Sequence, residues 1–209
     1  MGKLWIFGDS FSAPFTNDDI SGFGVPYIKH KGYVPLIYSD IISRNLTMTH
    51  MNFAYGGSDN YTILAALCGK QHLINDEDLI IVGWSAHNRY RIINDQLKWS
   101  IVHLNHLNGD INVNKQSLLR DESADTLKEI ELWSNLLNRT FKNQIIFWTP
   151  FNLTIPGVIN PRNHIPIVDI VVETNGKIND SHYSETTHFE LANLLMEYLP
   201  DNVSKKQII

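Results

Sequence analysis

Short apolar runs alternate along the chain with longer amphipathic stretches. The apolar runs have the length of buried strands and are expected at 3–7, 47–54, 79–83, 144–149 and 165–172. Between and after them, apolar residues recur at helical spacing, at 33–46, 60–74, 95–108, 121–141 and 184–199. Strands that alternate with helices are typical of a parallel sheet with helices on both faces. The pattern therefore predicts an α/β fold with a mostly parallel five-stranded sheet.

The last helix has the clearest start. Ser184 is a favourable N-cap, because its hydroxyl can accept from the N–H groups of the first turn, and Glu185 suits the positive end of the helix dipole. The apolar positions that share one face of this helix are Phe189, Ala192, Leu195 and Leu199. We expect this face to pack against the sheet.

Length and charge narrow the class of protein. The chain has 209 residues, 43% of them hydrophobic, which is enough for one substantial core, so we expect a single domain over 1–209. It carries 17 Lys and Arg against 22 Asp and Glu, and neither sign forms a long block. This balance argues against nucleic acid or a membrane surface as the partner. The lone Cys68 lies among residues of an apolar helix stripe, so we expect a buried thiol.

Targeting signals are not found in the sequence. The first apolar run is interrupted at Gly8 and Asp9, too early for the core of a signal peptide. No run is long enough to span a bilayer. We therefore expect a cytoplasmic or virion-associated protein.

Glycines and polar residues follow the ends of the first three predicted strands. These segments are LWIFGDSFS at 4–12, NFAYGGSDN at 52–60 and VGWSAHNR at 82–89. Ligands of an open parallel sheet bind outside the carboxyl ends of its strands. We therefore expect the three segments to meet in one crevice, bordered by the irregular stretches 11–32 and 151–164.

Ser10 is the candidate nucleophile in this crevice. A tight turn through Gly8 and Asp9 would lift its hydroxyl out of the sheet, with the following backbone amides facing a developing negative charge. The alternative is a plain strand-to-loop turn with a capping serine. Near the other end of the chain, Asp180 and His182 lie two residues apart directly before the last helix. Serine, histidine and aspartate together are the set that a serine hydrolase uses.

These segments resemble the SGNH hydrolase superfamily, also called GDSL esterases and lipases. GDSFS at 8–12 is similar to the first block of that family, and NFAYGGSDN resembles the second block, whose glycine serves the oxyanion hole. The segment 32–57 between them also resembles the family's aromatic, proline, apolar helix and asparagine-led strand. The resemblance implies a three-layer α/β/α flavodoxin-like sandwich. It also implies that Gly57, with Gly56 as the alternative, donates to the oxyanion.

The third block departs from the family pattern, which is Gly-x-Asn-Asp. Here the residues are Gly83-Trp84-Ser85-Ala86, so Ser85 stands where the oxyanion-donating asparagine is usual. The resemblance implies that Ser85 or the nearby Asn88 replaces this donor. Loss of an ideal donor costs about 10²-fold in rate.

The fifth block departs too, because the family usually has Asp-x-x-His. When His182 is aligned with the catalytic histidine, Asn179 falls on the usual aspartate and Asp180 lies one place later. An Asp-x-His spacing occurs in SGNH-like polysaccharide O-acetyltransferases and O-acetylesterases. We therefore take Asp180 as the third member of the triad.

The resemblance implies a serine esterase that hydrolyses small acyl esters, such as acetyl esters, on a carbohydrate. His182 would take the proton of Ser10, Asp180 would orient the imidazole, and the N–H groups of Ser10 and Gly57 would hold the oxyanion. Asp9 joins the residues expected near the oxyanion or the substrate. No metal or organic cofactor is needed. Two alternatives stay open: a catalytically silent SGNH-fold binding or structural protein, and an O-acyltransferase that uses the same triad.

Other residues near these blocks have simpler expected roles. We expect Arg89 to brace the site, with a substrate carboxylate as its alternative partner. His188 is expected to pack locally in the last helix. Trp84 and Tyr55 could form an aromatic wall for a sugar ring, although aromatic residues at strand ends usually belong to the core.

Overall fold

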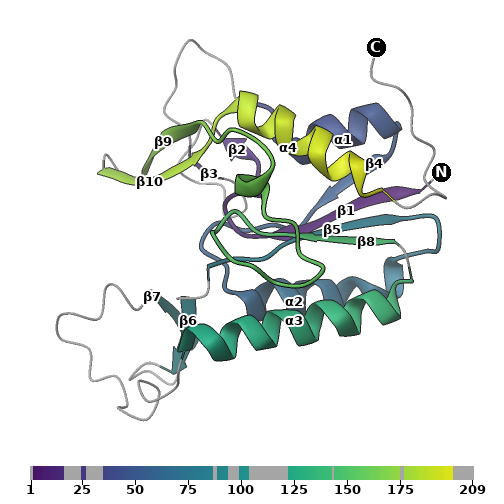
Figure 1. Ribbon diagram of the computed structural model, residues 1–209, viewed down its shortest axis with the longest axis horizontal. Coiled ribbons are helices and arrows are strands. Elements are labelled where there is room, and N and C mark those ends of the chain that lie inside the picture. Colours follow the sequence, from purple (N-terminus) through teal and green to yellow (C-terminus); the bar gives the residue numbers. More distant parts are fainter. Residues whose placement is uncertain are drawn as a thin grey trace.

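A computed structural model describes the backbone of residues 2–16, 25–26, 35–86, 89–93, 99–103, 122–142, 144–174 and 177–199 (Figure 1). Side chains are described for the same residues except 25–26, 90–93, 99–103, 122–125, 170–174 and 177–181. The calls for Asn88 and for the side chain of Asp180 therefore lie outside the described part of the chain.

The centre of the fold is a parallel sheet. Its strands are β1 (Lys3–Gly8), β4 (Thr49–Asn52), β5 (Leu79–Gly83) and β8 (Ile145–Trp148), in the spatial order β4-β1-β5-β8. Each neighbouring pair in this order is parallel. The order is that of a flavodoxin-like sheet, in which the chain reverses direction next to β1. The predicted α/β class is thus confirmed.

Helices cover both faces of this sheet (Figure 1). On one side α1 (Tyr38–Leu46) and α4 (Glu185–Glu197) pack over a cluster that contains Leu4 and Ile6. On the other side α2 (Asn60–Lys70) and α3 (Glu122–Thr140) pack over a cluster that contains Trp5 and Phe7. Successive residues of β1 thus alternate between two apolar layers, which explains its uninterrupted apolar run.

The expected fifth strand at 165–172 is not part of this sheet. β9 (Asp169–Thr174) instead pairs antiparallel with β10 (Lys177–Tyr183) in a separate two-stranded sheet. Beyond β8, Ile159 makes an isolated parallel bridge to Trp148. Among the described residues the central sheet therefore has four strands. The two segments that form the hairpin are neighbours in sequence, so their pairing closes a shorter loop than pairing with β8 would.

The prediction of a helix at 95–108 is also wrong, as far as the structure describes this segment. β7 (Trp99–His103) pairs antiparallel with β6 (Arg89–Ile93). The remaining residues of the predicted helix lie outside the described part of the chain. A short apolar run fits either periodicity, and β-branched Ile101 and Val102 favour the extended form once a partner strand is present.

The helices that were predicted correctly still place two side chains differently from expectation. α2 buries Asn60, Ile63 and Leu67, so Cys68, expected in the core, is exposed on the opposite side. α4 begins after Ser184, whose Oγ accepts a hydrogen bond from the Thr187 N–H at 3.3 Å, as predicted. Ala192, Leu195 and Leu199 of its predicted apolar face are buried, whereas Phe189 is exposed. The remaining short elements are β2 (Phe15–Thr16), β3 (Val25–Pro26), η1 (Gln71–Leu73) and η4 (Pro161–Asn163).

Two glycines allow the turn after β1 to lie close against the sheet. Gly8 and Gly83 are register partners at the ends of β1 and β5. A Cβ on either glycine would lie 2.5 Å from Ser12 Oγ, closer than packed atoms approach. Ser12 Oγ accepts a hydrogen bond from the Tyr38 hydroxyl at 3.0 Å, which ties the turn to α1. The absence of side chains at the two strand ends therefore makes room for the turn that carries Ser10.

Candidate active site

Ser10 lies in a tight turn at the carboxyl end of β1. The Asp9 carbonyl accepts hydrogen bonds from the N–H groups of Ser12 and Ala13, both at 3.0 Å. Asp9 Oδ1 accepts a further bond from the Phe11 N–H at 3.0 Å. Ser10 is buried, and its Oγ has no hydrogen-bond partner among the described residues. The turn thus holds Ser10 by its backbone and leaves the hydroxyl unused.

The segment after β4 is tied directly to this turn. Asn52 Nδ2 donates to the Ser12 carbonyl at 2.8 Å, and the Tyr55 N–H donates to the Gly8 carbonyl at 3.1 Å. Gly57 follows with a φ of 83°, a left-handed conformation that side-chain-bearing residues rarely adopt. A Cβ built on Gly57 would meet no atom within 4 Å. The space beside Gly57 is therefore open, and its role as an oxyanion donor stays a prediction.

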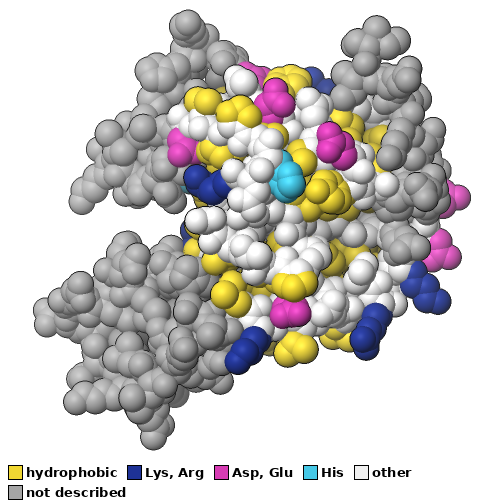
Figure 2. Space-filling model, viewed as in Figure 1, with side chains coloured by type: hydrophobic (Ala, Val, Ile, Leu, Met, Phe, Trp, Pro, Cys, Tyr) yellow, Lys and Arg dark blue, Asp and Glu magenta, His cyan; other side chains and the backbone are white. Residues whose placement is uncertain are grey.

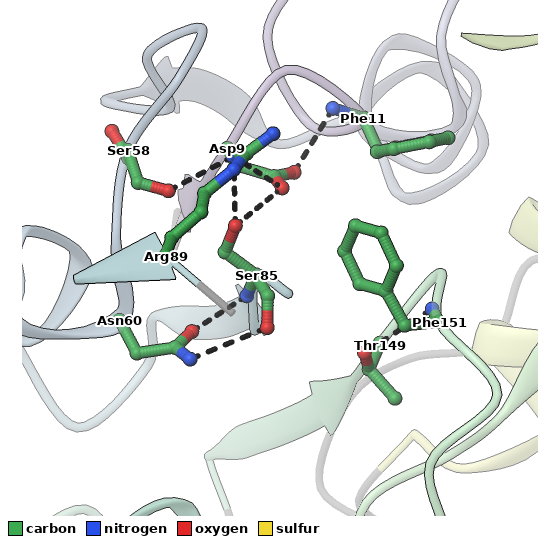
Figure 3. A network of polar contacts seen from close by, with 8 residues as sticks. All are labelled: Asp9, Phe11, Ser58, Asn60, Ser85, Arg89, Thr149 and Phe151. Atoms are coloured by element: carbon green, nitrogen blue, oxygen red, sulfur yellow. Dashed lines mark hydrogen bonds and ion pairs between the residues drawn. The ribbon is translucent and has the colours of Figure 1, made fainter. Parts of the chain in front are cut away.

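Ser85 has a different set of contacts from the one expected for an oxyanion donor. It is fully buried, and its Oγ donates to Asp9 Oδ2 at 2.8 Å and accepts from Arg89 Nη1 at 2.8 Å (Figure 3). Its backbone is held on both sides by Asn60, whose Oδ1 accepts from the Ser85 N–H at 2.6 Å and whose Nδ2 donates to the Ser85 carbonyl at 3.2 Å. A hydroxyl has a single proton to donate. In this structure that proton goes to Asp9.

Arg89 forms a buried ion pair with Asp9. Its Nη1 lies 3.1 Å from Asp9 Oδ2 and donates at 3.0 Å to the Ser58 carbonyl (Figure 3). The expectation that Arg89 braces the site is confirmed. Burial raises the pKa of Asp9, while the Arg89 guanidinium, the Ser85 hydroxyl and the Phe11 N–H act in the opposite direction. The ion pair therefore joins β6 and the end of β5 to the residue that precedes Ser10.

His182 lies in β10, beside the Ser10 turn. It is buried, and its ring stacks on Phe11 with a centroid distance of 4.8 Å and an interplanar angle of 27°. Phe15 meets the same imidazole edge-on at 6.4 Å. Phe11 directly follows Ser10, so the stack brings residues from the two ends of the chain together. The structure therefore brings His182 into contact with the turn that carries Ser10.

Asp180 lies in the same strand as His182. Its backbone pairs with Val172, while His182 pairs with Ile170, and the register shifts between Ile178 and Asp180. The extended backbone is the geometry that an Asp-x-His spacing needs. The position of the Asp180 carboxylate is not described, so its role stays a prediction.

Phe11 and Asn60 are site residues that the sequence analysis missed. Phe11 also meets Phe151 edge-on at 5.7 Å, so the 151–164 stretch does border the turn (Figure 3). Trp84, by contrast, is fully buried and donates through Nε1 to Ser134 Oγ at 3.0 Å. It therefore belongs to the core and does not form the aromatic wall for a sugar ring that was considered from the sequence. Tyr55 is exposed. Phe11 sits inside the GDSFS segment, but only its contact with a residue 171 positions away reveals its part in the site.

His188 packs behind His182 in the last helix. Its ring lies among those of Tyr38, Phe15 and Tyr183, with centroid distances of 6.1, 5.9 and 6.0 Å. Burial, and to a smaller extent the nearby His182, lowers the pKa of His188 to about 3, while Asp40 acts in the opposite direction. The expectation that His188 packs locally is confirmed.

This burial makes a prediction about acid stability. Native His188 stays neutral down to about pH 3, whereas the unfolded chain binds a proton near the ordinary value of 6.5. The unfolded state therefore gains protons as the pH falls below 6.5, and stability should fall by up to about 1.4 kcal/mol per pH unit from this residue. Urea unfolding at pH 7 and pH 5 should show a smaller loss in His188→Phe than in the wild type. His72→Gln, which removes an exposed histidine, is the control and should match the wild type.

The described residues contain no group of three or more His, Cys, Asp or Glu side chains that could hold a metal ion. A cavity of about 380 Å³ lies elsewhere, between β8 and the segment 153–160, and neither Ser10 nor His182 lines it. We place the candidate site at the strand ends, because the reactive side chains converge there.

No described helix has both the length and the apolar character needed to cross a membrane.

The visible surface carries charges of both signs. On the face seen in Figure 2, described Lys and Arg side chains and described Asp and Glu side chains are spread among polar and apolar ones. No large patch of one sign forms among the described residues of this face. The surface seen there therefore adds no second charged site to the one at the strand ends.

Among solved structures, the chain is similar to a bacterial esterase. That protein is an acetyl xylan esterase (Est2A) from the rumen bacterium Butyrivibrio proteoclasticus, 14% identical to this chain with a TM-score of 0.47. The match covers 94% of this chain and 62% of that one, so the chain spans less than two thirds of the esterase's length. No protein-family model matches the chain, and no curated protein sequence does.

Proposed function

We propose that the protein is a serine ester hydrolase of the SGNH type that removes small acyl groups from a carbohydrate. The observation that carries this proposal is the position of Ser10. Its hydroxyl is buried without a described partner, at the carboxyl end of β1, on a turn whose next residue stacks on His182. A buried hydroxyl without a partner costs free energy, so a site that keeps one is well suited to supply the partner with the substrate.

The proposed reaction is acyl transfer through a covalent intermediate. Ser10 Oγ forms a bond to the ester carbonyl carbon as its proton passes to His182, and the carbonyl π electrons move to the oxygen. The tetrahedral intermediate collapses when the carbon–alkoxy bond breaks, and the alcohol leaves with the proton from His182. A water molecule then bonds to the acyl carbon as it gives a proton to His182. The bond between that carbon and Ser10 Oγ breaks, His182 returns the proton to Oγ, and the acid leaves. No electrons are gained or lost overall.

The oxyanion is held in this proposal by backbone N–H groups of Ser10 and Gly57. The Gly57 backbone is open and lies on the segment that is hydrogen-bonded to the Ser10 turn. Ser85 acts indirectly, through Asp9, because its hydroxyl donates its proton to the Asp9 carboxylate. Ser85 therefore does not supply the side-chain donor of the family's third block, and the alternative donor Asn88 lies outside the described residues. With the backbone N–H groups acting alone, we expect a modest turnover number.

The substrate class follows from the room around Ser10 and from the spacing of Asp180 and His182. Only 7% of the Ser10 surface is exposed, and Phe11 and Phe151 crowd the turn, which favours a short acyl group such as acetyl. The Asp-x-His spacing resembles that of enzymes that add or remove acetyl groups on polysaccharides, which supports a sugar as the alcohol.

The test is a rate measurement with a chromogenic acetyl ester, with and without an acceptor sugar. Release of the chromophore in water alone, with free acetate as the product, supports the hydrolase. Release that requires the sugar and yields acetylated sugar would instead identify an O-acyltransferase. No release in either case, with folded protein, would favour a silent binding protein.

A further inference from the structure

We propose that the Asp9–Arg89 ion pair is a positioning device for His182: ionised Asp9 stabilises the imidazolium formed during attack, and Arg89 keeps Asp9 ionised. The proposal rests on the proposed function, because His182 must act as the base. It assigns Asp9 a role toward the base, in place of the expected role toward the oxyanion or substrate. Asp180 keeps its proposed role of orienting the ring.

The geometry joins Asp9 to His182 through Phe11. The Phe11 N–H donates to Asp9 Oδ1 at 3.0 Å, while the Phe11 ring stacks on the imidazole at 4.8 Å. Arg89 and Ser85 engage the other carboxylate oxygen, Oδ2. The guanidinium therefore contacts the Oδ2 side of Asp9. The other oxygen, Oδ1, is bonded to the backbone of the turn against which His182 packs.

Burial makes this charge effective and also makes it costly. Only 1% of the Asp9 surface is exposed, and electrostatic interactions are stronger away from water. The same burial raises the pKa of Asp9 and would neutralise an isolated carboxyl group. The Arg89 guanidinium is the largest opposing influence, followed by the Ser85 hydroxyl and the Phe11 N–H. Without Arg89, therefore, less of Asp9 would be ionised at a given pH.

The coupling between Asp9 and His182 acts in both directions. A charged His182 lowers the pKa of Asp9. Linkage requires that ionised Asp9 favour the charged form of His182 by the same free energy. Among the described residues, the other titratable groups near the two are Arg89 and Tyr38 on the Asp9 side and His188 and Tyr183 on the His182 side. The backbone of Asp180 lies in the same strand as His182. A positive charge on His188 would oppose the effect, but burial keeps that ring neutral at neutral pH.

The direct test is an NMR titration of the His182 imidazole, assigned with a His182→Gln variant. His182 should titrate at lower pH in Asp9→Asn than in the wild type, because the nearby negative charge is gone. Each pH unit of that change corresponds to about a tenfold loss of imidazolium stabilisation, and kcat should fall about tenfold or more. Asp78→Asn is the matched control. Asp78 is a buried carboxylate that accepts from Lys3 N and Trp5 Nε1 at the opposite end of β1, so its loss should leave the His182 titration unchanged.

A second set of variants keeps the Asp9 carboxylate and changes only its support. Ser85→Ala removes one hydrogen bond to the ionised form, so the pKa of Asp9 should rise and less negative charge should face His182. The acid limb of kcat/KM, which reports protonation of the base His182, should therefore move to lower pH, with KM little changed. Arg89→Gln should move the limb further in the same direction. Arg89→Lys, which keeps the charge, should recover part of the difference. A structural role alone would lower the amount of folded protein without moving the pH profile.

The outcomes separate this inference from the proposed function. Ester cleavage together with an unchanged His182 titration in folded Asp9→Asn would overturn the inference and leave the function standing. A shifted titration without ester cleavage in the wild type would overturn the function and leave the coupling standing. If Asp9→Asn does not fold, Ser85→Ala and Arg89→Gln decide, and wild-type pH profiles in both would overturn the inference.

Discussion

A Ser10→Ala variant is expected to lose about 10⁴- to 10⁶-fold in kcat on an acetyl ester. The variant has no oxygen to form the acyl-enzyme, while Gly57 and His182 stay in place. Steady-state hydrolysis of a chromogenic acetyl ester measures the loss. A burst of chromophore equal to the enzyme concentration should disappear at the same time, because that burst reports the covalent intermediate.

The same variant should fold at least as well as the wild type. Ser10 Oγ is buried and has no hydrogen-bond partner among the described residues, so its removal deletes a desolvated polar atom and breaks no described bond. The free energy of unfolding in urea should stay unchanged or rise by about 1 kcal/mol. Inactivity combined with full stability would mark Ser10 as a functional residue.

Ser39→Ala is the matched control for this experiment. Ser39 lies in α1, and its Oγ is likewise buried without a described hydrogen-bond partner. Its removal should leave hydrolysis at the wild-type rate. A stable Ser10→Ala protein that still cleaves the ester would remove Ser10 as the nucleophile, and equal losses in both variants would point to a packing effect.

Asp180→Asn is expected to cost about 10³- to 10⁴-fold in kcat, whereas Asn179→Ala should cost little. An ionised carboxylate stabilises the imidazolium that forms when His182 accepts the Ser10 proton. An asparagine can hold the ring but adds no compensating charge and favours the wrong tautomer. The two residues are neighbours in β10, so both variants change a side chain of the same strand. Only Asp180→Asn removes a carboxylate.

The measurement is again the hydrolysis rate, combined with the His182 titration. His182 should titrate at lower pH in Asp180→Asn than in Asn179→Ala. A large loss in Asn179→Ala together with an active Asp180→Asn would show that the usual Asp-x-x-His register, and not the Asp-x-His spacing, describes this strand. In that case Asp9 would be the carboxylate that supports His182 without Asp180.

The local pattern was sufficient for most of the central fold. Four of the predicted strands became β1, β4, β5 and β8. β1, β5 and β8 are apolar at successive positions because they are buried on both faces, whereas β4 lies at the edge of the sheet and is only partly buried. The pattern failed at 95–108 and at 165–172, where hairpin partners that lie nearby in the chain determine the structure. Apolar periodicity shows that a segment is buried, but it does not show which segment covers it.

For the candidate site, the sequence by itself determined which residues stand at strand ends: Ser10 after β1, Gly57 after β4, and Ser85 after β5. Only the tertiary structure decided their partners. The bonds from Ser85 and Arg89 to Asp9 span 76 and 80 residues, and the Phe11 ring meets His182 from the other end of the chain. Such contacts depend on the sheet register that sets Gly8 beside Gly83 and on the packing of β10 over the turn. Local propensity carries no information about either, because both arise from burial shared between distant segments.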